Sequence, residues 1–86
     1  MLSSKHRRTL ERLFAVPTLS NIKFGDVEAL VKALGGEVRQ GDGSRVAFEL
    51  DGGARAYLHR PHPGNQAKRY QVEQVREWLR GKGVTP

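Results

Sequence analysis

The stretch 41–63 constrains the fold most strongly, because it holds two strand-like runs joined by a glycine-rich turn. Apolar side chains occupy every second position of residues 45–50, and the same holds for residues 54–59. This period is typical of strands that bury one face. The turn sequence Asp51-Gly52-Gly53 between them is a strong hairpin signal. The sequence therefore predicts an antiparallel hairpin.

The length of its loop follows from the apolar pattern. A two-residue loop sets apolar side chains opposite polar ones, whereas a three-residue loop with a left-handed Gly53 pairs Leu50 with Ala54 and gathers the apolar side chains on one face. We therefore predict the three-residue loop. On the solvent-exposed face this register pairs Glu49 with Arg55, Ala47 with Tyr57 and Arg45 with His59.

The rest of the chain supplies helices and one more strand. Apolar periodicity predicts helices over about residues 4–15, 24–34 and 70–80, and a short strand over 37–40. The sequence thus predicts an α+β fold, in which a three-stranded antiparallel sheet carries helices on one face and an extra helix precedes them. The expected core consists of Val27, Leu30, Val31, Leu34, Val38, Val46, Phe48, Leu50, Leu58, Val72, Val75, Trp78 and Leu79.

A turn over 41–43 would join the first two strands. A three-residue loop here pairs Val38 with Val46 on the buried face and sets Arg39 beside Arg45 on the exposed face. Two like charges in that position repel each other, and a bound anion would relieve the repulsion.

Length and composition set the class of protein and of partner. The 86 residues predict a single domain, and the chain has no cysteine, no apolar run of about 20 residues and no signal-peptide pattern. We therefore expect a cytoplasmic protein without a membrane partner. The net charge of +6, with no acidic residue between Gly52 and Val72, predicts an anionic partner such as nucleic acid.

Several short motifs, in order, resemble the HicA toxins of HicAB toxin–antitoxin modules. They are Gly43-Ser44 at the start of a strand, Pro61-His62-Pro63 after the next strand, and the pattern Val75…Leu79…Gly83-Val84 in the closing helix. The resemblance covers residues 24–84 and leaves 1–23 as an N-terminal extension and linker.

The resemblance implies a fold and a function. The fold is similar to that of double-stranded-RNA-binding domains, α-β-β-β-α. The function is that of an mRNA interferase, an endonuclease that hydrolyses messenger RNA, with a HicB-like antitoxin that covers its active face. In this family the catalytic histidine directly follows Gly-Ser, whereas here Arg45 stands in that position.

His59 is the main catalytic candidate, because the expected register places it opposite Arg45. Histidine ordinarily titrates near pH ~6.5, which suits proton transfer to and from a ribose hydroxyl without a metal. Arg45 and Arg39 are candidates to bind the scissile phosphate and to stabilise its developing charge. His62 matches the family motif and is a second candidate for catalysis, or for contact with RNA or antitoxin; the alternative is a solvated side chain in a rigid turn.

RNA binding is expected to use an aromatic ring and several cations. Tyr57 can stack on a base, although it can equally serve to cover the sheet beside Ala47. Arg39, Arg45, Arg60, Lys68 and Arg69 are expected to contact phosphates, so binding should weaken by orders of magnitude between ~50 and ~200 mM salt. No metal and no cofactor are expected.

Three other functions stay open at this point. The first is a non-catalytic RNA-binding or antitoxin-binding module on the same fold, which the missing histidine after Gly-Ser permits. The second is a basic adaptor for an acidic protein, and a basic helix 4–15 lying on a membrane is a weaker option. An RNA cleavage assay, with His59→Ala as control, separates an enzyme from these alternatives.

Overall fold

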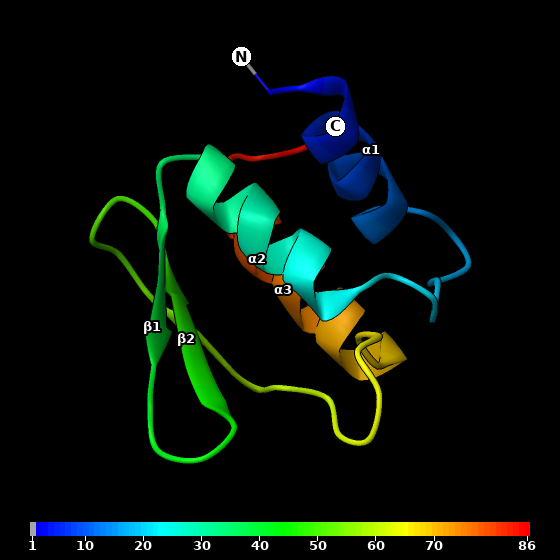
Figure 1. Cartoon of the computed structure of the whole chain (residues 1–86). Helices are drawn as coiled ribbons and strands as arrows, with labels where there is room; N and C mark the ends of the chain where they lie inside the picture. The colour runs from blue at the N-terminus through cyan, green and yellow to red at the C-terminus, as the bar shows by residue number, and fades with distance from the viewer. Residues whose placement is uncertain (1) are drawn as a thin grey trace.

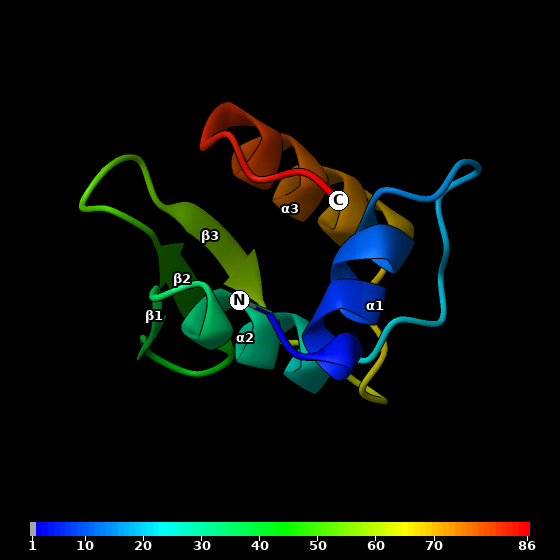
Figure 2. The same ribbon diagram turned by 90° about the horizontal axis from the view of Figure 1, so that it is seen from above.

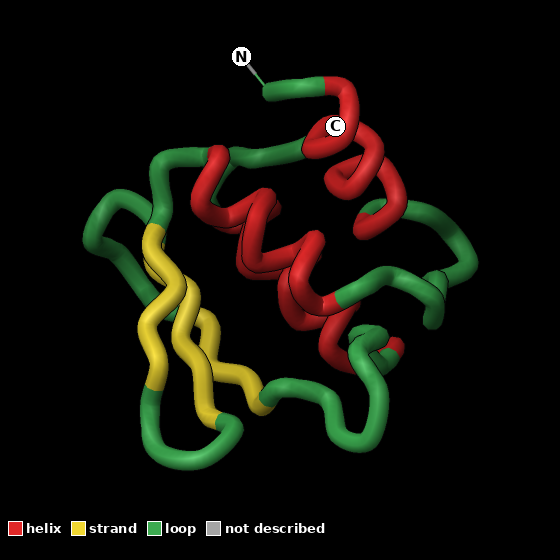
Figure 3. The backbone as a smooth tube through the Cα atoms, viewed as in Figure 1, coloured by secondary structure: helices red, strands yellow, loops and turns green. Residues whose placement is uncertain are grey.

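A computed structural model describes residues 2–86, so the first residue of the predicted extension lies outside the described part of the chain. The element order is helix, helix, three strands, helix (Figure 1; Figure 3). The strands form one antiparallel sheet in the order β1-β2-β3, so the predicted α+β class is confirmed. The elements are α1 (Ser4–Leu13), α2 (Phe24–Ala33), β1 (Glu37–Gln40), β2 (Arg45–Glu49), β3 (Ala56–His59) and α3 (Arg69–Gly81).

The elements are stacked in layers. Figure 2 shows the sheet on one side, α2 and α3 next to it, and α1 beyond them. α2 contacts β1 and β2, and α3 contacts β3. Within the described residues, α1 contacts both other helices and no strand. All helices therefore lie on one side of the sheet, and the opposite face of the sheet is open to solvent.

α1 is formed by a serine cap and an apolar stripe. The Oγ of Ser3 accepts a hydrogen bond from the backbone N–H of His6 at 3.2 Å, which satisfies one of the free donors at the start of the helix. Leu10 and Leu13 are buried. At the other end, the Nε of Arg76 in α3 donates to the carbonyl of Leu13 at 2.8 Å. These contacts fix α1 against the helical layer.

The core lies between the sheet and the helices around Phe48. The ring centroid of Phe48 lies 5.9 Å from that of Phe24 and 6.1 Å from that of Trp78. Most of the predicted core is buried, but Trp78, Val38 and Leu34 are only partly buried. Val38 lies on an edge strand, and the indole N–H of Trp78 reaches a main-chain carbonyl at the rim of the sheet. Nine buried residues lie outside the predicted set: Thr9, Leu10, Leu13, Ile22, Phe24, Ala47, Ala56, Ala67 and Gln71.

The pairing of β2 with β3 follows the predicted register. Arg45 lies opposite His59 and Ala47 lies opposite Tyr57. These four side chains belong to the open face, because the alternate residues of both strands are buried under the helices. The register thus brings the predicted catalytic pair together.

The turn of this hairpin differs from the prediction. The residues of this turn with a left-handed backbone conformation are Asp51, with φ 55°, and Gly52, with φ 66°. The prediction that Gly53 adopts this conformation is therefore wrong. The N–H of Gly53 donates to the carbonyl of Leu50 at 3.1 Å, which closes a two-residue turn. The predicted pairing of Leu50 with Ala54 is therefore wrong as well.

A β-bulge keeps the register in spite of the shorter turn. Ala54 and Arg55 together lie between the turn and the ladder, where the opposite strand has only Glu49. An extra residue on one strand shifts the pairing by one position, and so restores the apolar face that a plain two-residue loop would break.

β1 pairs with β2 two residues away from the predicted register. The prediction set Arg39 beside Arg45 and Val38 beside Val46, and both pairs are wrong. The loop between the strands begins one residue later than predicted and spans 42–44. A shift of two residues keeps each side chain on its predicted face. Arg39 therefore stays on the open face, but it lies opposite Ala47 and not opposite Arg45, so the expected pair of like charges does not occur.

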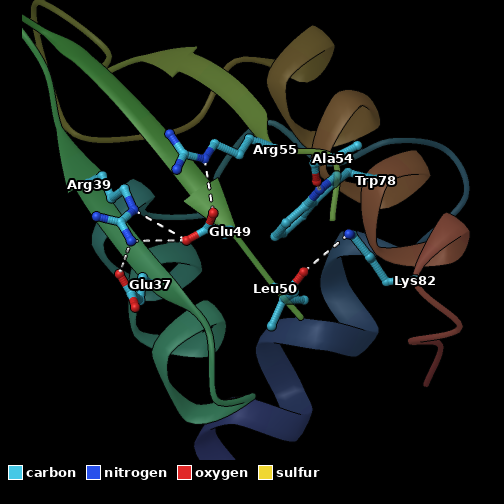
Figure 4. Close-up of polar contacts among 8 residues, drawn as sticks. All are labelled: Glu37, Arg39, Glu49, Leu50, Ala54, Arg55, Trp78 and Lys82. Carbon is cyan, nitrogen blue, oxygen red and sulfur yellow. Dashed lines mark hydrogen bonds and ion pairs between the residues drawn. The ribbon is translucent and has the colours of Figure 1, made fainter. Parts of the chain in front are cut away.

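Side chains of α3, and of Lys82 directly after it, form hydrogen bonds along the edge of the sheet at β3. An edge strand ordinarily presents unpaired main-chain groups to solvent. Here four side chains donate to main-chain carbonyls within 50–59, at distances of 2.6, 2.8, 2.8 and 3.1 Å (two of them in Figure 4). Two of these bonds reach β3 itself, at the carbonyls of Tyr57 and His59, and the other two reach the hairpin before it, at Ala54 and Leu50. The donors are Gln71, Gln74, Trp78 and Lys82.

Candidate nucleic-acid interface

The open face of the sheet carries a shallow hollow with a volume of about 610 Å³. Side chains from all three strands, and from the bulge before β3, line it. Ala47 is a small residue in this lining, and it leaves room between the larger side chains around it. The larger side chains of the lining include Arg39, Arg45, Arg55, Tyr57 and His59.

Arg45 and His59 form a pair at one end of the hollow. They lie opposite each other at the start of β2 and the end of β3, and both side chains are exposed. Within residues 2–86, Arg45 forms no ion pair, whereas the other two arginines of the hollow do. A cation without a carboxylate partner is available to bind a phosphate.

Within residues 2–86, the ring of His59 has one hydrogen-bond partner. The Oγ of Ser44 lies 3.2 Å from its Nδ1. The backbone is fixed nearby, because the N–H of Arg60 donates to the carbonyl of Ser44 at 2.8 Å. The Nε2 of the ring is then the nitrogen that remains for a ligand.

Tyr57 lies at the centre of the open face. Its side chain is 68% exposed and it pairs across the ladder with Ala47. An exposed ring beside a small residue has room for a base to stack on it.

Glu49 organises the opposite end of the face. Its carboxylate accepts from Arg39 at 3.1 Å and from Arg55 at 3.0 Å, and Arg39 also contacts Glu37 at 2.7 Å (Figure 4). The hydrogen bonds from Arg55 and then Arg39 lower the pKa of Glu49 below its ordinary value. The same carboxylate raises the pKa of Arg55. The charges of these two arginines are thus largely balanced within the protein.

The remaining predicted site residues lie outside the hollow. Arg60 contacts Glu28 of α2 at 2.7 Å and lies over the ring of Phe24 at 6.0 Å, so it turns toward the helices. His62 is exposed in the loop after β3. Lys68 caps α3 and Arg69 opens it, and the Nε of Arg69 donates to the carbonyl of Thr18 at 3.4 Å. The structure brings together Arg39, Arg45, Tyr57 and His59, and it does not bring Arg60, His62, Lys68 and Arg69 to them.

Two residues that support His59 were not predicted. One is Ser44: the Gly43-Ser44 motif was noted in the sequence, but the contact of Ser44 with the His59 ring depends on the conformation of the loop at 42–44. The other is Gln71, which is 2% exposed: its Nε2 donates to the carbonyl of His59 at 2.6 Å and its Oε1 accepts from the N–H of Lys68 at 3.0 Å. Its position one turn before Val75, on the apolar side of α3, was a signal in the sequence for a buried polar contact.

Two further observations apply to residues 2–86. Residues 2–86 include no cluster of three His, Asp or Glu side chains that could hold a metal ion. None of the three helices has the length and apolar content that crossing a bilayer requires.

Comparison with known protein families gives one match. The family model described as HicA toxin of bacterial toxin-antitoxin matches residues 24–80, well over half of the chain. The match begins at the first residue of α2 and ends within α3, so α1 lies outside it. No curated protein and no solved structure matches the chain.

Proposed function

Because this chain belongs to the HicA toxin family of toxin–antitoxin systems, we propose that it is an endoribonuclease that cleaves messenger RNA in the cytoplasm. The observation that supports this proposal best is the pair of Arg45 and His59 at one end of an open, solvent-exposed hollow. The pair combines a proton-transfer group with a cation that has no carboxylate partner within the described residues.

In the proposed reaction, the Nε2 of His59 takes the proton of a ribose 2′-hydroxyl. The 2′-oxygen then forms a bond to the adjacent phosphorus, and the bond from phosphorus to the 5′-oxygen of the next nucleotide breaks. The imidazolium returns the proton to that leaving oxygen, so protons and electrons balance and a cyclic phosphate results. The proton transfers run through imidazole, and the proposal requires no metal.

Arg45 is proposed to bind the phosphate at which this reaction occurs. Its guanidinium can donate two hydrogen bonds to the non-bridging oxygens, on which negative charge grows in the transition state. Tyr57 is proposed to stack on a neighbouring base and so to place the ribose near His59.

The proposed partner that silences the enzyme is a HicB-like antitoxin. We propose that it covers the open face of the sheet, since a protein bound there would block Arg45 and His59 together. Arg39 and Arg55 are already paired with Glu49. They would therefore contribute to the antitoxin interface or to RNA binding mainly through shape complementarity rather than through charge.

An RNA cleavage assay on the purified protein tests the proposal. His59→Ala is expected to lower the cleavage rate by ~100-fold or more, the usual scale for loss of a general acid–base group. Arg45→Ala should lower both affinity and rate. His62→Ala is the matched control, because this histidine lies outside the hollow and should cost less.

The folded state is checked by the unfolding midpoint of each variant. His59 is exposed, so the fold should survive its replacement, and the antitoxin should still bind through the rest of the open face. Full cleavage by the His59→Ala protein would refute the assignment and turn attention to His62.

The second candidate function is a non-catalytic RNA-binding or antitoxin-binding module. The observation in its favour is that Arg45 occupies the position at which the resemblance places the catalytic histidine. Salt-dependent RNA binding without cleavage by the wild-type protein would support this alternative, and binding to an acidic protein but not to RNA would support an adaptor.

A further inference from the structure

We propose that Ser44 is the residue that positions His59, by accepting a hydrogen bond from its Nδ1–H and so keeping Nε2 as the free, basic nitrogen. The contact that carries this inference is the 3.2 Å approach of Ser44 Oγ to His59 Nδ1. Ser44 touches no reacting atom and acts through the histidine. The inference rests on the proposed nuclease function and gives the Gly43-Ser44 motif a task in this chain.

The backbone around both residues is fixed. Gly43 has φ 62°, a left-handed conformation that favours glycine, and it directs the chain into Ser44. The carbonyl of Ser44 accepts from the N–H of Arg60, and the carbonyl of His59 accepts from the buried Gln71. Ser44 and His59 are therefore held next to each other by main-chain contacts that do not involve the ring.

The ring itself needs a further contact. An exposed histidine on a strand can rotate among several side-chain conformers, and its neutral form can carry the proton on either nitrogen. Within residues 2–86, Ser44 supplies the one side-chain hydrogen bond to the ring of His59. This contact orients the ring, and it favours the Nδ1–H tautomer when the hydroxyl acts as the acceptor.

The direction of the hydrogen bond follows from the proposed cycle. When His59 is charged, both ring nitrogens carry protons, so Nδ1 can only donate to Ser44. If Nδ1 also donates in the neutral form, the same contact persists while Nε2 accepts and returns its proton. The opposite arrangement would place a proton on Nε2 in the neutral form, and the ring could not act as a base from the hollow.

Nitrogen NMR of the His59 ring, without RNA, tests the inference directly. At alkaline pH, where histidine rings are neutral, the wild-type ring is expected to be mainly the Nδ1–H tautomer. Ser44→Ala should remove this preference, and Ser44→Thr, which keeps the hydroxyl, should retain it. His6 and His62 serve as internal references, and Ser20→Ala is a matched control on a distant exposed serine.

The cleavage assay provides the second readout. Ser44→Ala should lower kcat by about tenfold with little change in KM, as expected for the loss of one hydrogen bond to a charged group, and Ser44→Thr should restore most of it. An Nε2–H tautomer in the wild type, or the same tautomer in wild type and Ser44→Ala, would overturn the inference whatever the activity. A tautomer change without a change in kcat would also overturn it. A wild-type protein that cleaves no RNA would refute the nuclease instead, while the NMR result still tests the contact itself.

Discussion

Glu49 controls the charge of the open face more than any other single residue. It is the only carboxylate within the described residues that contacts both Arg39 and Arg55, and its side chain is 17% exposed. Two cations that composition alone would assign to RNA are therefore neutralised within the protein. Arg45 is left as the cation of the hollow with no carboxylate beside it within residues 2–86.

Removing the charge of Glu49 should destabilise the protein in a pH-dependent way. The pKa of Glu49 is lower in the folded state than its ordinary value of 4.5, because Arg55 and Arg39 donate to the charged form. The stabilisation is thus complete above about pH 4.5 and is lost as the pH falls through the lower folded pKa. Urea unfolding of wild type and Glu49→Gln should show a stability gap at neutral pH that closes in acid.

The matched control is Glu77→Gln. Glu77 forms an exposed ion pair with Arg80 within α3, and such pairs contribute little to stability. A gap between wild type and Glu49→Gln that is equally large at neutral and acid pH would contradict the role assigned to this carboxylate.

At the scale of elements, α1 is part of the packed structure although the family match does not include it. Leu10 and Leu13 belong to the same buried cluster as residues of α2, α3 and the sheet. The Nε of Arg76 bonds the last carbonyl of α1, and its Nη2 donates to Thr18 at 2.9 Å. We propose that residues 2–23 fold together with the rest of the chain.

Leu13→Ala tests this proposal. Leu13 is 0% exposed, so the substitution removes buried contacts and leaves a cavity, and the cost is expected to be about 2–5 kcal/mol in the free energy of unfolding. Val16→Ala is the control, because Val16 is 88% exposed just after the helix and should change stability little. Chemical unfolding of both variants measures the difference, and equal stability would show that α1 contributes nothing to the core.

The two hairpins show what a sequence can and cannot predict. The β2–β3 register followed from apolar pairing, because the two loop lengths compared differ by one residue and only one of them places the apolar side chains of both strands on the same face. The same criterion could not decide the β1–β2 register, since a slip of two residues keeps Arg39 and Val38 on their faces. The contact of Ser44 with His59 depends on that loop, and so it could be found only in the structure.

At the scale of the whole molecule, the net charge of +6 is distributed unevenly over the surface. The open face of the sheet carries Arg45, while Arg60, Lys68 and Arg69 lie near α2 and the start of α3. An RNA that binds across the hollow is therefore expected to make fewer phosphate contacts than the composition suggests.

The salt dependence of RNA binding measures the number of such contacts. Each neutralised phosphate of a single strand adds about 0.7 to the slope of log affinity against log salt. Arg45→Ala should lower this slope by about that amount, whereas Arg60→Ala should lower it less, because Glu28 already engages Arg60 at 2.7 Å. Titrations between ~50 and ~200 mM salt provide the slopes, and equal effects of the two substitutions would contradict this distribution of contacts.

The covered edge of β3 limits how copies of this protein can associate. A strand from another molecule could join the sheet only beside β1, since the side chains from α3 occupy the other border. Two copies that paired through β1 would use up the available edge of each sheet, and the assembly would close as a two-fold dimer. Growth into a fibre by successive strand addition needs two available borders per molecule, and this architecture provides one.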